Sequence, residues 1–356
     1  MSNNQGIADI PEFTASEWVD HIAVPYLTDT DPTAPVQGLV GDTGGGKTSI
    51  SIQACRKAGF LEEEIYVTKP ANKTLVDYVG VPAAVDGKTK FLPPEVIADC
   101  MSGKIKVIVL DEAMDCGMAS MQNMVASWLL DKNVADHQML KSLKIIWTGN
   151  ESHHRAGSQD INRKVSTRSG LSRLGRSLDD LLAHAMASGW RRETVAYLHW
   201  KGENELYGEP DMDPREPIRP SPRQWENVSK SPHDLPPAIQ TRSFARYIPS
   251  GKAVGYMGFL KLVNELPPIQ SIIDDPASAP ISDKVEVTYA LVSRLLQEVD
   301  TPAMFQHMMK YVSRLRAEPQ TVFVNSCVKS VPQVKATREY TKWAVTNQAY
   351  FGFDNE

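Results

Sequence analysis

The residues between Gly41 and Thr48 have the types and the spacing that are needed to hold a phosphate group. They read GDTGGGKT, which fits the pattern GxxxxGK[ST]. Glycines let backbone N–H groups converge on phosphate oxygens without a clash from Cβ atoms. We therefore predict that Lys47 reaches the β- and γ-phosphates of a nucleotide and that the Thr48 hydroxyl ligates Mg²⁺. The predicted nucleotide-binding set is Gly41, Asp42, Thr43, Gly44, Gly45, Gly46, Lys47, Thr48 and Ser49.

Two adjacent acids provide the carboxylates that this chemistry requires. Asp111 and Glu112 directly follow the apolar run at residues 107–110. Such a run is typical of a parallel strand buried on both faces, and ligands bind at the carboxyl ends of these strands. We expect Asp111 to hold Mg²⁺ through water and Glu112 to polarise the attacking water as general base.

A second strand-like segment, residues 143–147, is followed by Thr148, Gly149 and Asn150. We expect this segment to be a buried strand, with Asn150 beside the strand at residues 107–110. There Asn150 would orient the attacking water or contact the γ-phosphate. The alternative is that Asn150 only forms a turn.

The glycine-rich loop has the flanking elements that a phosphate site needs. A β-prone run at residues 36–40 precedes it, and Ile50, Ala54 and Ala58 follow at helical spacing. The amino end of that helix would add positive partial charge at the phosphate. The order of strand, loop and helix therefore favours a nucleotide site over a flexible glycine turn.

This series of motifs resembles the AAA+ ATPases. An acid pair on one strand and a polar residue ending the next separate that family from small GTPases and kinases. Residues 75–82, 91–113 and 221–225 look like the MoxR-type branch, which bacteria and phages carry. The resemblance covers residues 30–270. It implies an α/β fold: an AAA+ P-loop nucleotide-binding core with a parallel sheet, then a helical lid and a helical C-terminal region.

The resemblance also implies how the site is completed. In these rings ATP, with Mg²⁺, lies between subunits, so a homo-oligomer, a hexamer, is expected. Arg223 in the motif SPR matches the sensor-2 arginine. For the arginine finger we expect Arg173 first and Arg176 second, although this stretch departs from the family pattern. The catalytic residues expected are Glu112, Asn150, Arg173, Arg176 and Arg223.

A local basic stretch surrounds the candidate finger. Three interpretations are open: ATP sensing between subunits, a nucleic-acid contact facing a pore, and a solvated loop face. Its members are Arg163, Lys164, Arg168, Arg173 and Arg176.

The chain divides by composition into four expected parts. They are an N-terminal segment (1–30), the ATPase core (31–200), the helical lid (201–270) and the helical C-terminal region (271–356). Residues 202–223, rich in proline, glycine and acids, mark the start of the lid. On the family's architecture, the loop at residues 77–90 would face a pore or a partner, with Tyr78 and Val79 touching the substrate.

Composition limits the class of protein. The 356 residues are 42% hydrophobic and 23% charged, which excludes wholesale disorder. The net charge of -5 disfavours a protein that depends on non-specific contacts with nucleic acid. No apolar run approaches the roughly 20 residues of a membrane span, and four scattered cysteines suit reduced thiols. We expect a cytoplasmic protein without membrane contact, in the host cytoplasm if a phage encodes it.

The function expected is Mg²⁺-dependent ATP hydrolysis by a ring-forming MoxR-type ATPase that remodels or activates a partner protein. The family implies a partner of the von Willebrand factor A type. One alternative is a DNA-processing AAA+ ATPase, a helicase or its loader. Another is a nucleotide-binding structural protein that does not hydrolyse ATP, which the intact Asp111–Glu112 pair disfavours.

Overall fold

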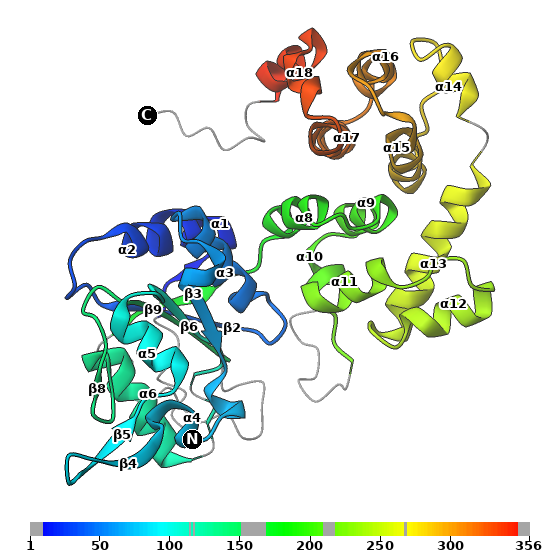
Figure 1. The fold of residues 1–356 in the computed structure, drawn as a ribbon. Helices are drawn as coiled ribbons and strands as arrows, with labels where there is room; N and C mark the ends of the chain where they lie inside the picture. The colour runs from blue at the N-terminus through cyan, green and yellow to red at the C-terminus, as the bar shows by residue number, and fades with distance from the viewer. Residues whose placement is uncertain are drawn as a thin grey trace, which may run out of the picture. The chain divides into compact units, whose positions relative to one another are not determined.

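The computed structural model describes residues 10–113, 115–116, 118–150, 169–208, 218–266 and 269–347. The chain divides into two compact units, residues 1–177 and 178–356 (Figure 1). The first unit contains a parallel sheet covered by helices, and the described part of the second is helical. The predicted α/β class, with a helical C-terminal region, is confirmed.

A six-stranded parallel sheet organises the first unit, in the order β1-β10-β2-β9-β6-β3. Strand β9 lies between β2 and β6, so the predicted phosphate loop and the acid pair flank the end of β9. The strands are β1 (Glu12–Phe13), β2 (Val36–Gly41), β3 (Ile65–Thr68), β6 (Val107–Leu110), β9 (Lys144–Asn150) and β10 (Ser169–Leu174).

Alternate residues of the central strands supply two separate cores, one on each face of the sheet. Ile108 and Leu110 pack with α4 (Val76–Val79), α5 (Glu95–Ser102) and α6 (Ala119–Asp131). On the other face Val107 and Val109 pack with α3 and the N-terminal helices. All four residues of β6 are fully buried, as a central parallel strand requires. The elements packed on this second face are the π-helical η1 (Trp18–Ala23), α2 (Val24–Thr28) and α3 (Lys47–Lys57), and the short α1 (Ala15–Glu17) precedes η1.

The segment expected to touch a substrate is built differently from the prediction. Tyr78, at the end of α4, is fully buried, and its hydroxyl lies 2.7 Å from Thr68 Oγ1. Its ring packs edge-on against Trp128, with ring centroids 5.3 Å apart, and burial raises the pKa of Tyr78 to about 12. The prediction for Tyr78 is therefore wrong, because its ring anchors α4 to the core. Exposed hairpin strands follow it, β4 (Val81–Val85) and β5 (Lys88–Leu92).

The second unit packs around one core cluster that draws on helices from α8 to α18. Tyr197 lies at the centre of an aromatic group, with Trp225, Tyr256 and Phe259 within 5.7 Å of its ring centroid. The helices are α8 (Leu178–Ala187), α9 (Arg192–Lys201), α10 (Glu203–Tyr207), α11 (Pro222–Lys230), α12 (Pro237–Phe244), α13 (Ser250–Glu265), α14 (Gln270–Asp274), α15 (Val285–Glu298), α16 (Pro302–Val312), α17 (Ala317–Ser330) and α18 (Arg338–Thr346).

Helices α8 and α9 pack in this second core. The expected boundary of the ATPase core, residues 31–200, would have included both helices except for the last residue of α9. Smaller elements complete the chain. They are η2 (Glu62–Glu64), η3 (Pro70–Asn72), η5 (Pro332–Ala336), β7 (Asn133–Val134) and β8 (His137–Gln138).

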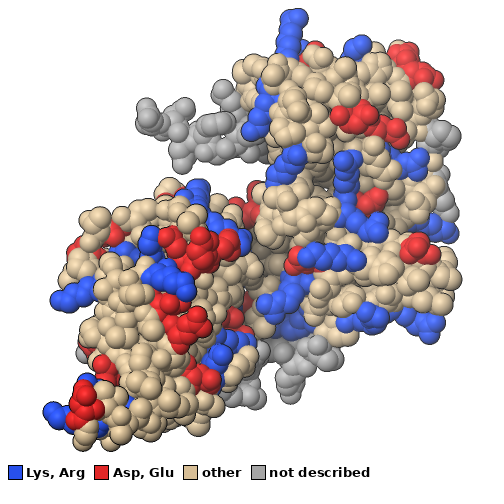
Figure 2. Space-filling model, in the orientation of Figure 1, with Lys and Arg blue, Asp and Glu red and all other residues tan. Residues whose placement is uncertain are grey.

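Acidic and basic side chains are interspersed over the face of the first unit that Figure 2 shows. Among the helices in the described ranges, none has both the length and the apolar character to cross a membrane.

Candidate nucleotide-binding site

The glycine-rich loop, residues 42–46, connects β2 to the first turn of α3. Gly44 and Gly46 have φ values of +82° and +91°, in the left-handed region that side chains disfavour. A Cβ atom at Gly45 would lie 3.2 Å from the Asp42 carbonyl oxygen. These positions of the loop therefore favour glycine. Gly46 is the N-cap residue of α3, and the first N–H groups of that helix have no helical partners. This arrangement fits a phosphate, and the predicted order of strand, loop and helix is confirmed.

Lys47 is held close to this loop. Only 6% of the surface of Lys47 is exposed. The ammonium donates to the carbonyl oxygens of Gly41 at 2.9 Å and Asp42 at 2.8 Å, and to Asn150 Oδ1 at 3.1 Å. All three acceptors are neutral oxygens. These contacts hold the Lys47 ammonium beside the glycine-rich loop, where a phosphate would bind.

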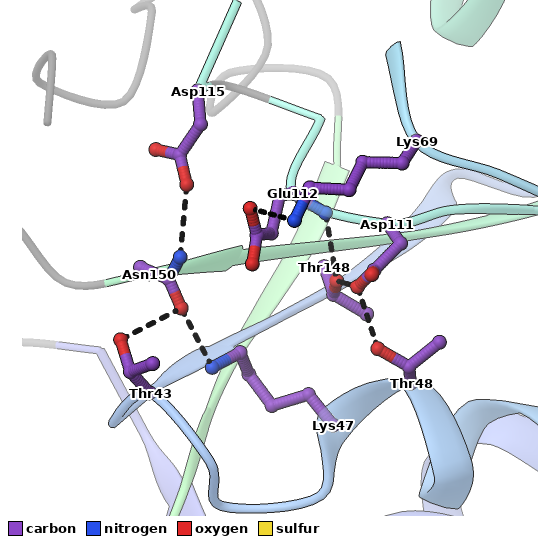
Figure 3. Close-up of polar contacts among 9 residues, drawn as sticks. All are labelled: Thr43, Lys47, Thr48, Lys69, Asp111, Glu112, Asp115, Thr148 and Asn150. Atoms are coloured by element: carbon purple, nitrogen blue, oxygen red, sulfur yellow. Dashed lines mark hydrogen bonds and ion pairs between the residues drawn. The ribbon is translucent and has the colours of Figure 1, made fainter. Parts of the chain in front are cut away.

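Asp111 meets two hydroxyl groups at the end of β6 (Figure 3). Its Oδ1 accepts from Thr48 Oγ1 at 2.5 Å and from Thr148 Oγ1 at 2.7 Å. Carboxylate and hydroxyl oxygens are suitable ligands for Mg²⁺, which takes its remaining ligands from phosphate and water. Thr48 and Asp111 thus form the pair of side chains that the sequence predicts as metal ligands, brought together from α3 and β6.

Glu112 has a backbone that side chains rarely adopt, with φ at +48°. Its N–H donates to Thr148 Oγ1 at 3.1 Å, which fixes the turn after β6. Its side chain is 19% exposed, and Oε2 lies 2.5 Å from the Lys69 ammonium. A strained non-glycine residue of this kind is common at functional sites.

Asn150 is the last residue of β9, which pairs with β6 as the sequence predicts. Its Oδ1 accepts from Lys47 Nζ and, at 3.4 Å, from Thr43 Oγ1. Its Nδ2 donates to Asp115 Oδ2 at 2.8 Å. The side chain thus connects the phosphate loop to the segment after the acid pair (Figure 3).

Three residues at this site have no predicted role in the sequence: Lys69, Thr148 and Asp115. Thr148 and Asp115 belong to segments that the motifs already mark. Lys69 follows β3 without any motif, and its only signal is its place after a β-prone run. Because β3 pairs with β6, the two strand ends lie together and Lys69 meets Glu112.

The predicted arginines lie at different places. Arg173 is a half-buried residue of β10, in register with Val40 of β2. Arg176 is exposed, and its Nη2 lies 3.4 Å from Oδ2 of Asp42, a residue of the glycine-rich loop. Residues 169–174 form a strand, so this part of the basic stretch is not a loop. The other three basic residues of the stretch, Arg163, Lys164 and Arg168, lie outside the described residues.

Two further predicted residues lie on helix surfaces. Ser49 is exposed on α3 in the first unit. Arg223 is exposed in the first turn of α11 in the second unit, where Ser221 caps the helix by accepting from the Gln224 N–H at 3.4 Å. The predicted helix start at the SPR motif is confirmed.

Comparison with known proteins gives distant structural similarities only. No protein-family model matches the chain, and no curated protein matches it. It is similar to NtrX from Brucella abortus in complex with ADP, with a TM-score of 0.37, 10% identity, and coverage of 95% of this chain and 68% of that chain. A second NtrX structure has a TM-score of 0.33, 11% identity, and coverage of 92% and 66%. The chain thus spans about two thirds of NtrX.

The chain is also similar to AMPPCP-bound DnaA from Aquifex aeolicus, with a TM-score of 0.34 and 14% identity, covering 96% of this chain and 92% of that chain. TM-scores this low establish neither a shared activity nor a shared partner. The function therefore has to be inferred from the site itself.

Proposed function

We propose that the chain is an ATPase that requires Mg²⁺. One observation carries the proposal: side chains from α3, from the end of β9 and from the residues directly after β3 and β6 meet beside the glycine-rich loop, at the carboxyl edge of the sheet. An ammonium, a hydroxyl–carboxylate pair, a second carboxylate and an amide are the groups that hydrolysis of a nucleoside triphosphate uses.

Each residue has a distinct task in this proposal. The loop N–H groups and Lys47 bind the phosphates, and Lys47 counters the charge that develops there. Mg²⁺, held by Thr48 and Asp111, would supply charge neutralisation at the phosphate oxygens. Glu112 accepts a proton from the water whose oxygen attacks the γ-phosphorus, while ADP leaves with the electrons of the broken bond. Asn150 orients that water through its amide.

We further propose an AAA+ ATPase of the MoxR type that assembles into a homo-oligomeric, hexameric ring and remodels a client protein. The sequence motifs support this finer assignment, and a partner of the von Willebrand factor A type belongs to it. Between the candidate fingers we prefer Arg176 to Arg173. Arg176 is exposed beyond the end of β10, whereas Arg173 lies inside the sheet. The contact between Arg176 and Asp42 would break when Arg176 meets the nucleotide of a neighbouring subunit.

Mixing two inactive variants tests the shared site. Lys47→Met cannot hold phosphate, and Arg176→Ala lacks the proposed finger, so each alone should hydrolyse little ATP. In a mixed ring, an Arg176→Ala subunit with an intact loop would meet Arg176 of a Lys47→Met neighbour. We expect activity to return on mixing. If sizing shows that both variants co-assemble and the mixture stays inactive, Arg176 does not act between subunits.

The DNA-processing alternative is tested in the same assay. Steady-state ATP hydrolysis is measured with and without single-stranded DNA. We expect no stimulation, because the chain is acidic overall and acidic and basic side chains are mixed on the face of the first unit that Figure 2 shows. A large stimulation that falls with added salt would favour DNA processing over protein remodelling.

A further inference from the structure

A cavity lies at the opposite edge of the sheet from the phosphate loop. It has a volume of about 420 Å³, within the range of small-molecule sites. Its lining includes the residues just before β6 and at the start of β9, with others from the end of α2 and from the segment after α3. Lys144 and Asn150 are the two ends of β9, so the cavity is about 20 Å from the phosphate site.

The walls of the cavity are mainly apolar. Such walls suit a ligand with an apolar body, and the few polar groups then decide its orientation. The apolar lining consists of Leu27, Pro32, Phe60, Ile105, Leu140 and Leu143.

Lys144 is the buried charge at this cavity. The residue is 6% exposed, and its ammonium lies 4.8 Å from the centroid of the Tyr26 ring. Among the described residues, no carboxylate oxygen lies within 4.0 Å of this ammonium. Burial lowers the pKa of Lys144, with a partly opposing effect from Asp29 and Asp31. A buried ammonium without a carboxylate partner is costly, because buried charges are normally paired.

The other charged groups of the lining are engaged elsewhere. Lys106 forms an ion pair with Glu64. Asp29 Oδ1 accepts from the Asp31 N–H at 2.9 Å, and Asp31 Oδ1 accepts from the Thr33 N–H at 2.8 Å, so both acids stabilise an exposed turn. The charges of Asp29 and Asp31 still act on Lys144, so the lining carries no excess of positive charge and disfavours a dianion.

We propose that this cavity binds a small monocarboxylate with a short apolar body, whose carboxylate pairs with the Lys144 ammonium. The apolar body lies against the aliphatic and aromatic walls. This binding site is separate from the proposed ATP site, since Lys144 and Asn150 occupy opposite ends of β9.

Calorimetric titration with sodium hexanoate tests the proposal on the full chain. Hexanoate should bind saturably to the wild type, and Lys144→Met should weaken binding roughly tenfold or more, the usual effect of losing a charged hydrogen bond. Hexan-1-ol and inorganic phosphate, each lacking half of the proposed ligand, should bind much more weakly. Lys230→Met, which removes an exposed lysine from α11, should bind hexanoate like the wild type.

A second variant guards against misfolding of Lys144→Met. Ser142 also lines the cavity, and Ser142→Trp should fill it and abolish hexanoate binding with Lys144 intact. The proposal is overturned if hexanoate does not bind the wild type. It also fails if a folded Lys144→Met or Ser142→Trp binds hexanoate normally, or if phosphate binds more tightly than hexanoate.

Discussion

At the scale of single residues, the contact between Lys69 and Glu112 bears most directly on the chemistry. The two charged atoms are 2.5 Å apart, and both side chains retain some exposure to solvent. In the proposed reaction a Glu112 oxygen must receive a proton from water. Lys69 competes for that carboxylate, so the ion pair has to open or rotate in each turnover.

Removing the Lys69 ammonium should therefore raise the rate of hydrolysis. We expect Lys69→Met to raise kcat by up to about fivefold, because a partly exposed ion pair contributes at most about 1 kcal/mol. KM for ATP should change little, since the proposed contacts of Lys69 do not include phosphate. Steady-state kinetics with Lys73→Met as a control would check this. A fall in kcat as deep as that of Glu112→Gln would instead make Lys69 a positioning residue for the base.

At the scale of elements, the close approach of β2 and β9 sets the distance between the phosphate loop and Asn150. Gly38 of β2 is in register with Trp147 of β9. A Cβ atom at Gly38 would lie 2.4 Å from Trp147 Cε2, which is fully buried. The indole N–H is also fixed by a hydrogen bond of 3.0 Å to Ser169 Oγ. The ring therefore cannot retreat without disturbing β10.

A methyl group at position 38 should consequently destabilise the first unit. We expect Gly38→Ala to lower the free energy of unfolding by about 1–3 kcal/mol, the usual cost of overpacking. Gly251→Ala is the control: no atom lies within 4 Å of its added Cβ, and it lies in helix α13, so a neutral or slightly stabilising effect is expected. Denaturant unfolding measures both. Equal stability of Gly38→Ala and wild type would show that the sheet can adjust at this contact.

Two half-buried histidines, His199 and His233, make the second unit sensitive to acid. Burial lowers the pKa of both His199 and His233. His233 Nε2 lies 3.1 Å from the Tyr256 hydroxyl. A pKa that is lower in the folded state than in the unfolded chain gives stability that is present above about pH 6.5 and is lost as the pH falls below it.

The thermal midpoint of the second unit should therefore fall on acidification from about pH 7 to about pH 5. His233→Gln should reduce this dependence, because the glutamine amide does not titrate. His184→Gln replaces an exposed histidine of α8 and should leave the pH profile unchanged. Calorimetric scans over this pH range would give the profiles, and identical slopes for His233→Gln and wild type would contradict the assignment.

The elements around the loop could be predicted because each is marked by a local pattern. The apolar runs predict β2, β6 and β9, and the SPR motif predicts the start of α11. Lys69 could not be predicted to meet Glu112, because that contact depends on the order of strands in the sheet. Strand β10 could not be predicted from local sequence, because its serines and glycine are weak strand formers and only pairing with β1 and β2 overrides that preference.

At the scale of the whole molecule, the chain consists of a sheet-containing unit and a helical unit. The proposed phosphate and metal groups all belong to the first, while Arg223 belongs to the second. That division of tasks depends on the central claim that the first unit hydrolyses ATP with Glu112 as base.

The most direct test of that claim measures ATP binding and phosphate release separately in the wild type and in Glu112→Gln. We predict that both bind ATP with Mg²⁺ with similar affinity. Phosphate release should be at least about 100-fold slower in the variant, the usual contribution of a general base. A variant that hydrolyses ATP at the wild-type rate, or a wild type that binds ATP and releases no phosphate in any assembly state, would contradict the account.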